Sequence, residues 1–255
     1  MKTTPVGLSS IVEFCDSTLG CADFGDWDKA FNGLQMANPG SVSRIAAAVD
    51  ASLTTCQMAA DSGADLLLVH HGLFWSPSHP WTGRRYDLVR LLVERGLAVY
   101  SAHLPLDAHA KLGNNIQICR ALGLPKPKPF FELKGRNIGF RSTTRIDREA
   151  LVVSLASVLG VDPVLLPGGP QSCRQIGVVS GGAGSDLAQI AALGIDTLIT
   201  GEGPHWTHAL SEDLGVNVIY GGHYATETFG VKALASAVGQ KFGLPWAFLD
   251  HPSGL

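Results

Sequence analysis

The chain has 255 residues, which predicts one large domain or two small ones and suffices to bury a core without a disulfide or structural metal. Its 19 Lys and Arg against 22 Asp and Glu give a net charge of −3, which excludes nucleic-acid binding through a generally basic surface but allows a local basic patch. The start lacks a signal-peptide pattern, no apolar run approaches the roughly 18 residues of a membrane span, and the five cysteines form no CxxC. We therefore expect a cytoplasmic protein without a membrane anchor or a disulfide framework.

The first part of the chain alternates short apolar runs with stretches of helical spacing. Strands are predicted over residues 45–49, 65–69 and 97–101, and helices over residues 54–62 and 86–95. Such alternation predicts a mainly parallel sheet covered by helices on both faces. In these sheets, ligand-binding groups gather just beyond the carboxyl ends of the strands.

The second part of the chain repeats this alternation. Its predicted elements are strands over 176–180, 197–200 and 216–220, and helices over 187–193, 209–214 and 227–241. A proline-rich stretch at residues 125–130 is the candidate boundary. We therefore divide the chain into a first α/β half, 1–128, and a second α/β half, 129–255.

The two halves are related by an internal repeat. A shift of 131 residues places 45–75 on 176–206 without a gap, and a shift of 120 places 99–107 on 219–227. The identities in the first match include Gly63/Gly194, Asp65/Asp196, Leu67/Leu198, Gly72/Gly203 and Trp75/Trp206. Two matches in the same order indicate duplication. The predicted fold is therefore two similar three-layer α/β halves.

Histidines and carboxylates follow the predicted strands of both halves. His70 and His71 come directly after one strand, and adjacent residues of an extended segment point to opposite sides, so we expect this pair to serve two neighbouring ions. His103 and Asp107 follow the next strand at a spacing of four. Two side chains at this spacing share a face if the chain enters a helix.

The same spacing recurs in the second half. The repeat places His103 on His223 and Asp107 on Glu227, and we expect Glu227 in the first turn of a helix preceded by Thr226. Imidazole and carboxylate groups suit zinc, iron, manganese, cobalt or nickel. Because these few ligands would leave coordination positions open on two ions, they favour a catalytic site.

Other polar residues near the strand ends have less defined roles. His103 could orient a ligand, and Glu202, which occupies the place of His71 in the second repeat, could act as an acid or base or be polar lining, as could His205 and Asp50. The remaining histidines, His79, His109, His208 and His251, are expected to be surface or packing residues. We take His103 and Glu202 as the catalytic candidates.

Two further motifs are expected to be structural. Residues 181–185, GGAGS, follow a strand and could bind phosphate through backbone N–H groups, but they lack the lysine of a P-loop and the GxGxxG spacing, which favours a plain turn. Residues 136–141, RNIGFR, place two cations on one extended segment, too few for nucleic acid.

Several strings together resemble the dinuclear metal-centre hexameric protein family, also called GTP cyclohydrolase I type 2 homologues or NGG-one-interacting factor three-like proteins. These strings are NGLQ at 32–35, VDAS at 49–52, GADLLLVHHGLFW at 63–75, SAHLPLDAH at 101–109, TGEGPHW at 200–206 and GGHYATETFGVKAL at 221–234. The resemblance runs from about Phe31 to Leu255 and implies two stacked halves, a two-metal site between them and a homohexamer. It places the metal ligands on His70, His71, Asp107, His223 and Glu227. The chain lacks the inserted domain of longer relatives.

The expected function is metal-assisted hydrolysis by a cytoplasmic enzyme that carries two divalent transition-metal ions, with zinc, iron and manganese as candidates. The family resemblance implies GTP ring opening and a small-molecule substrate such as a nucleotide, whereas the residues themselves also allow phosphoester hydrolysis. The alternative is a non-enzymatic metal-binding hexamer that serves as an assembly or adaptor protein. We expect neither a membrane nor a nucleic-acid partner for the enzyme.

Overall fold

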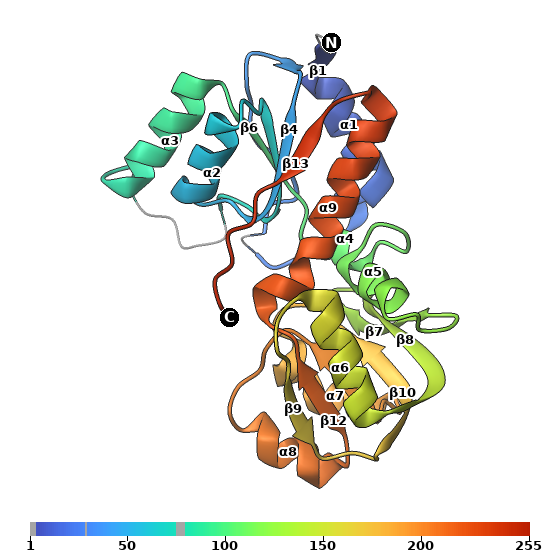
Figure 1. Cartoon of the computed structure of the whole chain (residues 1–255). Coiled ribbons are helices and arrows are strands. Elements are labelled where there is room, and N and C mark those ends of the chain that lie inside the picture. The colour runs from blue at the N-terminus through green and yellow to red at the C-terminus, as the bar shows by residue number, and fades with distance from the viewer. Residues whose placement is uncertain (1–3, 29, 75–79) are drawn as a thin grey trace. The chain divides into compact units, whose positions relative to one another are not determined.

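The computed structural model describes residues 4–28, 30–74 and 80–255 and shows a mixed α/β protein with a five-stranded and a six-stranded sheet (Figure 1). The chain divides into two compact units. The first contains Met1–Leu106 and Gly230–His251, and the second contains Asp107–Phe229 and Pro252–Leu255. Within the described ranges, none of the helices combines the length and apolarity needed to cross a membrane.

The first unit is a three-layer α/β structure. Its elements are β1 (Val6–Gly7), α1 (Leu8–Leu19), β2 (Gly33–Met36), β3 (Ser41–Val42), β4 (Ile45–Asp50), α2 (Leu53–Asp61), β5 (Leu66–His71), α3 (Arg84–Arg95), β6 (Ala98–Ser101), β13 (Trp246–Phe248) and the later part of α9 (His223–Phe242). The sheet has the order β13-β4-β5-β6-β2, parallel except for β2. Helices α2 and α3 cover one face, and α1 and α9 cover the other (Figure 1).

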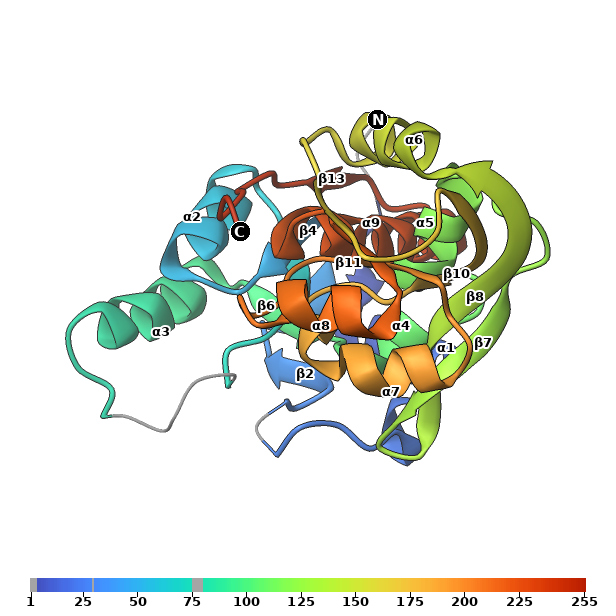
Figure 2. The ribbon, with the colours of Figure 1, turned by 90° about the horizontal axis from the view of Figure 1, so that it is seen from below.

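The second unit has the same three layers around a mixed sheet. Its elements are α5 (Asn114–Ala121), β7 (Lys128–Leu133), β8 (Arg136–Asp147), α6 (Arg148–Leu159), β9 (Val164–Pro167), β10 (Ser172–Val178), α7 (Leu187–Ala192), β11 (Thr197–Thr200), α8 (Thr207–Leu214), β12 (Asn217–Tyr220) and the start of α9; the short helix α4 (Leu104–Ala108) spans the boundary. Helices α5 and α6 pack on one face, and α7 and α8 lie side by side on the other (Figure 2).

The second sheet is only partly parallel. Its order is β7-β8-β10-β11-β12-β9, in which β10, β11 and β12 are parallel and the other three strands are antiparallel to their neighbours. The β7–β8 hairpin, which the sequence did not predict, turns at Lys134 and Gly135, both with positive φ. The expectation of a mainly parallel sheet is therefore confirmed for the first unit and wrong for the edges of the second.

Strand registers support the duplication. Ile45 pairs with Leu66 in the first sheet, and Ile176 pairs with Thr197 in the second, so both members of each pair are related by 131 residues. In the third strand, however, Leu66 pairs with Ala98 and Thr197 pairs with Asn217, which is a shift of 119 and not 120. The second repeat therefore has one additional residue between the strand and His223, and the alignment by 120 is wrong within the strand.

The repeated aspartate has the same role in both units. The carboxylate of Asp65 accepts hydrogen bonds from the backbone N–H groups of Ser43 and Arg44, at 2.6 and 3.2 Å. That of Asp196 accepts from the backbone N–H groups of Arg174, at 3.0 Å, and Gln175, at 2.8 Å, which are again 131 residues later. Each aspartate thus holds the chain in place where a central strand enters its sheet.

Replacing either aspartate by alanine should lower the free energy of unfolding by about 1–3 kcal/mol, because two backbone donors lose their charged acceptor. Chemical denaturation of Asp65→Ala and Asp196→Ala measures the loss, with the exposed Asp213→Ala as a matched control. Losses no larger than that of the control would contradict this role.

The two compact units do not follow chain order. The expected halves, 1–128 and 129–255, would each keep the helix that follows the third parallel strand. Instead, α5 belongs to the second unit, and the part of α9 from Gly230 onward belongs to the first. The buried residues of this part, Val231, Leu234, Ala235 and Val238, have the spacing of one helix face. The duplicated halves have therefore exchanged their last helices.

Candidate metal centre

Three histidine rings form a cluster in the first unit. His70 and His71 are the last residues of β5, and His103 lies two residues after β6. The ring centroids are 4.9 Å apart for His70 and His71, 4.9 Å for His70 and His103, and 5.6 Å for His71 and His103. One ring nitrogen of each lies within 4.8 Å of the other two, a spacing that can hold a metal ion. The expectation that the first two side chains point to opposite sides is therefore wrong.

Hydrogen bonds to the neighbouring strand ends explain the orientation of the first two rings. Nδ1 of the fully buried His70 lies 2.9 Å from the carbonyl oxygen of Ala102, just after β6. Nδ1 of His71 lies 2.8 Å from Oδ1 of Asp50, the last residue of β4. Because a carbonyl or a carboxylate oxygen only accepts, both Nδ1 atoms donate, which places the lone pair of each neutral ring on Nε2. This is the tautomer in which Nε2 can bind a metal.

The third histidine has a carboxylate partner that the sequence analysis missed. Nδ1 of His103 lies 2.8 Å from Oδ1 of Asp26, whose carboxylate also accepts from Asn32 Nδ2 at 2.9 Å and from the backbone N–H of Leu104 at 3.1 Å. Burial raises the pKa of Asp26, but the hydrogen bond and charge of His103 outweigh it and lower the pKa overall. Asp26 therefore stays ionised and fixes the His103 ring. It lies in a loop without periodicity, so no sequence signal identified it.

The NGLQ string at residues 32–35 supports this cluster from below. Besides its bond to Asp26, Asn32 accepts the backbone N–H of His103 through Oδ1 at 2.7 Å. Gln35 accepts the backbone N–H of Leu73 and donates to the carbonyl of Phe31. A Cβ atom at Gly72 would lie 2.2 Å from Gln35 Nε2, so only glycine fits after the two histidines. The string thus has a structural role beside the candidate ligands.

In the second unit, a histidine and two glutamates meet at the start of α9. The helix begins at His223 and not at the expected Glu227, so Glu227 lies one turn further along, on the same face. His223 Nε2 lies 3.2 Å from Glu227 Oε2, and His223 Nδ1 lies 2.8 Å from Glu202 Oε1. Thr226, the expected cap, bonds back to Gly222 within the first turn. Glu202 therefore orients His223 as Asp26 orients His103.

Asp107 is buried in the second unit near the end of β10. Its Oδ1 accepts hydrogen bonds from Asn114 Nδ2 at 2.8 Å and from Ser180 Oγ at 3.0 Å. Asn115 accepts the backbone N–H of Ser180 at 2.6 Å. The two asparagines at the start of α5 thus fix both the carboxylate and the chain that follows the strand.

The GGAGS segment packs against the Glu227 carboxylate. Gly181 has a φ of 67°, and a Cβ atom there would lie 2.4 Å from Glu227 Oε1. Its backbone N–H donates to Thr226 Oγ1 at 3.1 Å, and residues 183–186 form a 3₁₀ turn. The segment is therefore a turn, as expected, and its first glycine makes room for a candidate metal ligand.

The His223–Glu227 pair predicts a dependence on pH. Burial lowers the pKa of His223, but the hydrogen bonds and charges of Glu227 and Glu202 outweigh it and raise the pKa to about 9. A metal must displace this proton, so we expect metal affinity to rise as the pH increases toward 9 and then to level off. An NMR titration of the metal-free chain should show a His223 midpoint well above the usual value of about 6.5.

The variant Glu202→Gln should lower this midpoint, while Glu212→Gln, an exposed control, should leave it unchanged. A wild-type midpoint near 6.5 would contradict the assignment of the two glutamates as partners of His223.

The other predicted histidines lie elsewhere or outside the described residues. His109 Nδ1 accepts the backbone N–H groups of Lys111 and Leu112 at 3.2 and 2.9 Å, which makes it a turn residue. His205, His208 and His251 are exposed and belong to none of the metal-capable groups found in the described ranges. Trp75 and His79 lie outside the described residues.

The donor atoms suit a first-row transition metal. The described clusters offer imidazole nitrogens and carboxylate oxygens, most of them buried and each fixed by a second hydrogen bond. Such outer hydrogen bonds are typical of metal ligands, because they fix the tautomer and the ring orientation. The residues present in each unit therefore fit a metal, and they supply nitrogen and oxygen donors without a thiolate.

Comparisons with known proteins agree with this arrangement. Residues 6–253 match the model of the family described as Duf34/NIF3 (NGG1p interacting factor 3). A Deinococcus radiodurans protein named GTP cyclohydrolase 1 type 2 homolog is 45% identical over 89% of this chain and 88% of its own length, and a Halobacterium salinarum protein of the same name is 41% identical over 97% and 99%. The crystal structure of TTHA1606 from Thermus thermophilus is similar, with a TM-score of 0.91 and 37% identity over 98% of this chain and 100% of its own.

Proposed function

Because the chain belongs to the Duf34/NIF3 family, we propose that it is a metal-dependent hydrolase that binds two divalent transition-metal ions. The proposed ligands are His70, His71, Asp107, His223 and Glu227. Zinc, iron and manganese are the candidate ions, since all three accept imidazole and carboxylate donors.

The observation that carries the proposal is the histidine cluster of the first unit. Nδ1 of His70, of His71 and of His103 donates to an oxygen acceptor, so each neutral ring has its lone pair on Nε2. A purely structural cluster of histidines would not need three rings in the same tautomer with ring nitrogens within 4.8 Å of one another.

Two bound ions would supply an activated water as the nucleophile and polarise the bond under attack. The chain's own residues then have distinct roles. His103, fixed by Asp26, lies beside the ligands His70 and His71 and is assigned the transfer of a proton to or from the reacting water. Glu202 holds the ring of His223 and acts through it, so it is a positioning residue.

The first reaction to test is ring opening of GTP by hydrolysis at C8, because curated relatives carry the name GTP cyclohydrolase 1 type 2 homolog. Phosphoester hydrolysis is the second, since it uses the same activated water. The metal-loaded chain is incubated with GTP, other nucleotides and simple phosphoesters, and the products are separated by chromatography and identified by mass spectrometry. Turnover of one of these supports the proposal. A fully metallated chain that turns over none of them contradicts it and favours a metal-binding assembly protein.

We also propose a homohexamer, for which the low charged fraction of 16% is the supporting feature, because charged residues are depleted where subunit surfaces are buried. Sedimentation equilibrium should give a mass about six times 26.9 kDa. A concentration-independent monomer mass would contradict the assembly without bearing on the metal ligands.

A further inference from the structure

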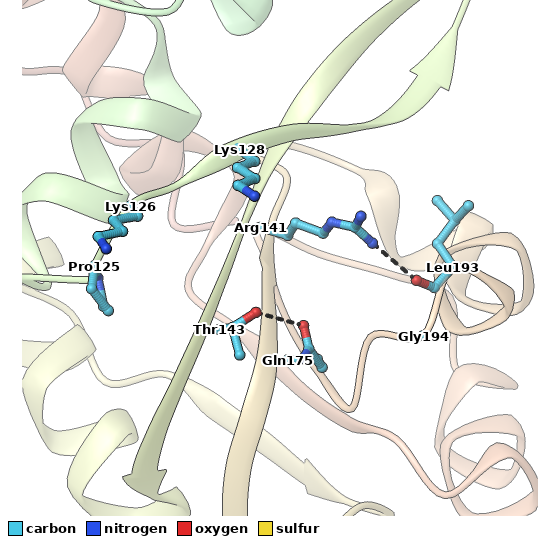
Figure 3. Close-up of a pocket in the computed structure, with 8 residues that line it drawn as sticks. All are labelled: Pro125, Lys126, Lys128, Arg141, Thr143, Gln175, Leu193 and Gly194. Carbon is cyan, nitrogen blue, oxygen red and sulfur yellow. Dashed lines mark hydrogen bonds between the residues drawn. The ribbon is translucent and has the colours of Figure 1, made fainter.

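A basic pocket in the second unit lies apart from the candidate metal ligands. It has a volume of about 530 Å³ and is lined by Pro125, Lys126, Lys128, Arg141, Thr143, Gln175, Leu193 and Gly194 (Figure 3). Leu193 and Gly194 precede β11 and so mark the amino end of that strand, whereas Glu202 and His223 follow the carboxyl ends of β11 and β12. The pocket is thus a separate feature of this unit.

The lining carries three positive charges and no carboxylate. Lys126, Lys128 and Arg141 are exposed, and the acidic residue nearest to Gly194 in the chain, Asp196, is not part of the lining. Its carboxylate instead accepts the backbone N–H groups of Arg174 and Gln175. The charge of the pocket is therefore uncompensated by its own lining.

Two of these cations lie directly opposite each other. Lys128 on β7 and Arg141 on β8 are register partners in an antiparallel pair, an arrangement in which like charges destabilise the sheet. Arg141 is held in place because its Nη1 donates to the carbonyl oxygen of Leu193 at 3.2 Å, as Figure 3 shows. The guanidinium keeps further donors for a ligand.

The third cation has an unfavourable backbone conformation. Lys126 has a φ of 46°, in the left-handed region that favours glycine, and the carbonyl of the preceding Pro125 accepts the Ser142 hydroxyl. Residues that break a local rule in this way gather at functional sites. Here a strained lysine and a repulsive cation pair meet in one hollow.

We propose that this pocket binds a small anion that carries one or more phosphate groups. Lysine and arginine donors are the usual phosphate ligands, and arginine adds a fixed fork of N–H groups. The hollow is larger than a phosphate and within the range of ligand pockets, and Pro125 and Leu193 give it apolar walls for an organic part. The site does not depend on the metal ligands and extends the proposed function.

The test is calorimetric titration of the full chain with pyrophosphate and with ATP at constant ionic strength, together with NMR of the backbone amides. We expect binding that shifts the amides of Thr143 and Gly194. Lys128→Gln should weaken binding at least about tenfold, as expected for the loss of one charge-assisted contact. Because this variant also removes the cation pair, the ligand-free protein should melt at an equal or higher temperature than the wild type.

The matched control is Arg145→Gln, which lies four residues after Arg141 on the same exposed face of β8 and outside the pocket. Its affinity should stay within about twofold of the wild type. Binding that survives Lys128→Gln, or shifts only amides near His223, overturns the proposal. So does an oligonucleotide that binds when neither pyrophosphate nor ATP does, since this would indicate a nucleic-acid surface.

Discussion

Glu227→Gln should abolish hydrolysis while the chain stays folded. A ligand of a bound ion contributes several kcal/mol to transition-state stabilisation, which corresponds to a loss of about 10³-fold or more. The amide keeps the shape of the carboxylate but lacks its charge, so the variant should also bind the metal more weakly. Activity, metal content and thermal melting of the same preparation measure the three effects.

The control for this variant is Glu212→Gln, an exposed residue of α8. It should retain full activity and metal content. If Glu227→Gln keeps more than a tenth of the activity with a normal metal content, Glu227 is not a ligand. If it loses activity together with its melting transition, its role is structural.

Asp26→Asn should have the second largest effect, although Asp26 is not itself a proposed ligand. The amide can present an N–H to His103 Nδ1 in place of the carboxylate, and this would favour the other ring tautomer. Outer hydrogen-bond partners of metal sites typically contribute 10–100-fold, so we expect a loss of activity in that range. The pH–rate profile should shift at the same time, because the charge beside His103 is lost.

A merely structural role would move neither the pH–rate profile nor the tautomer. NMR of the His103 ring nitrogens in wild type and Asp26→Asn reports the tautomer directly. An exposed aspartate of the first unit, Asp61, provides the control Asp61→Asn. An unchanged tautomer and profile in Asp26→Asn would contradict the positioning role.

The sequence predicted the central strands of both sheets because each is a short apolar run. β11 was predicted with the correct bounds, and β4, β5, β6 and β12 within two residues of each end. The signal was weaker where burial is one-sided. The alternating strand β8 and the helices α1 and α6 were not predicted, because no continuous apolar run marks them.

The candidate metal residues could be predicted because they follow strands at a regular spacing in both repeats. Three features of the site depend on tertiary contacts and had no signal in the chain. Asp26 reaches His103 across 77 residues, the side chains of His70 and His71 turn toward acceptors on neighbouring strands, and α9 begins a turn early, at His223. The exchange of the last helices between units likewise follows from packing and not from local pattern.

The basic pocket illustrates the same limit in another way. The sequence showed Arg136 and Arg141 as two cations on one strand, whereas the structure pairs Arg141 with Lys128 and leaves Arg136 near the hairpin turn. Lys126 joins them only because the chain turns back before β7. A charge cluster assembled from three separate positions cannot be seen in a window of sequence.

The central claim is that this chain holds two transition-metal ions, and elemental analysis tests it most directly. The protein is purified without a metal-binding tag and dialysed, and zinc, iron and manganese are measured against the protein concentration. The account predicts about two ions per chain, falling in Glu227→Gln. A ratio near zero in wild-type protein, even after incubation with each metal, would contradict it.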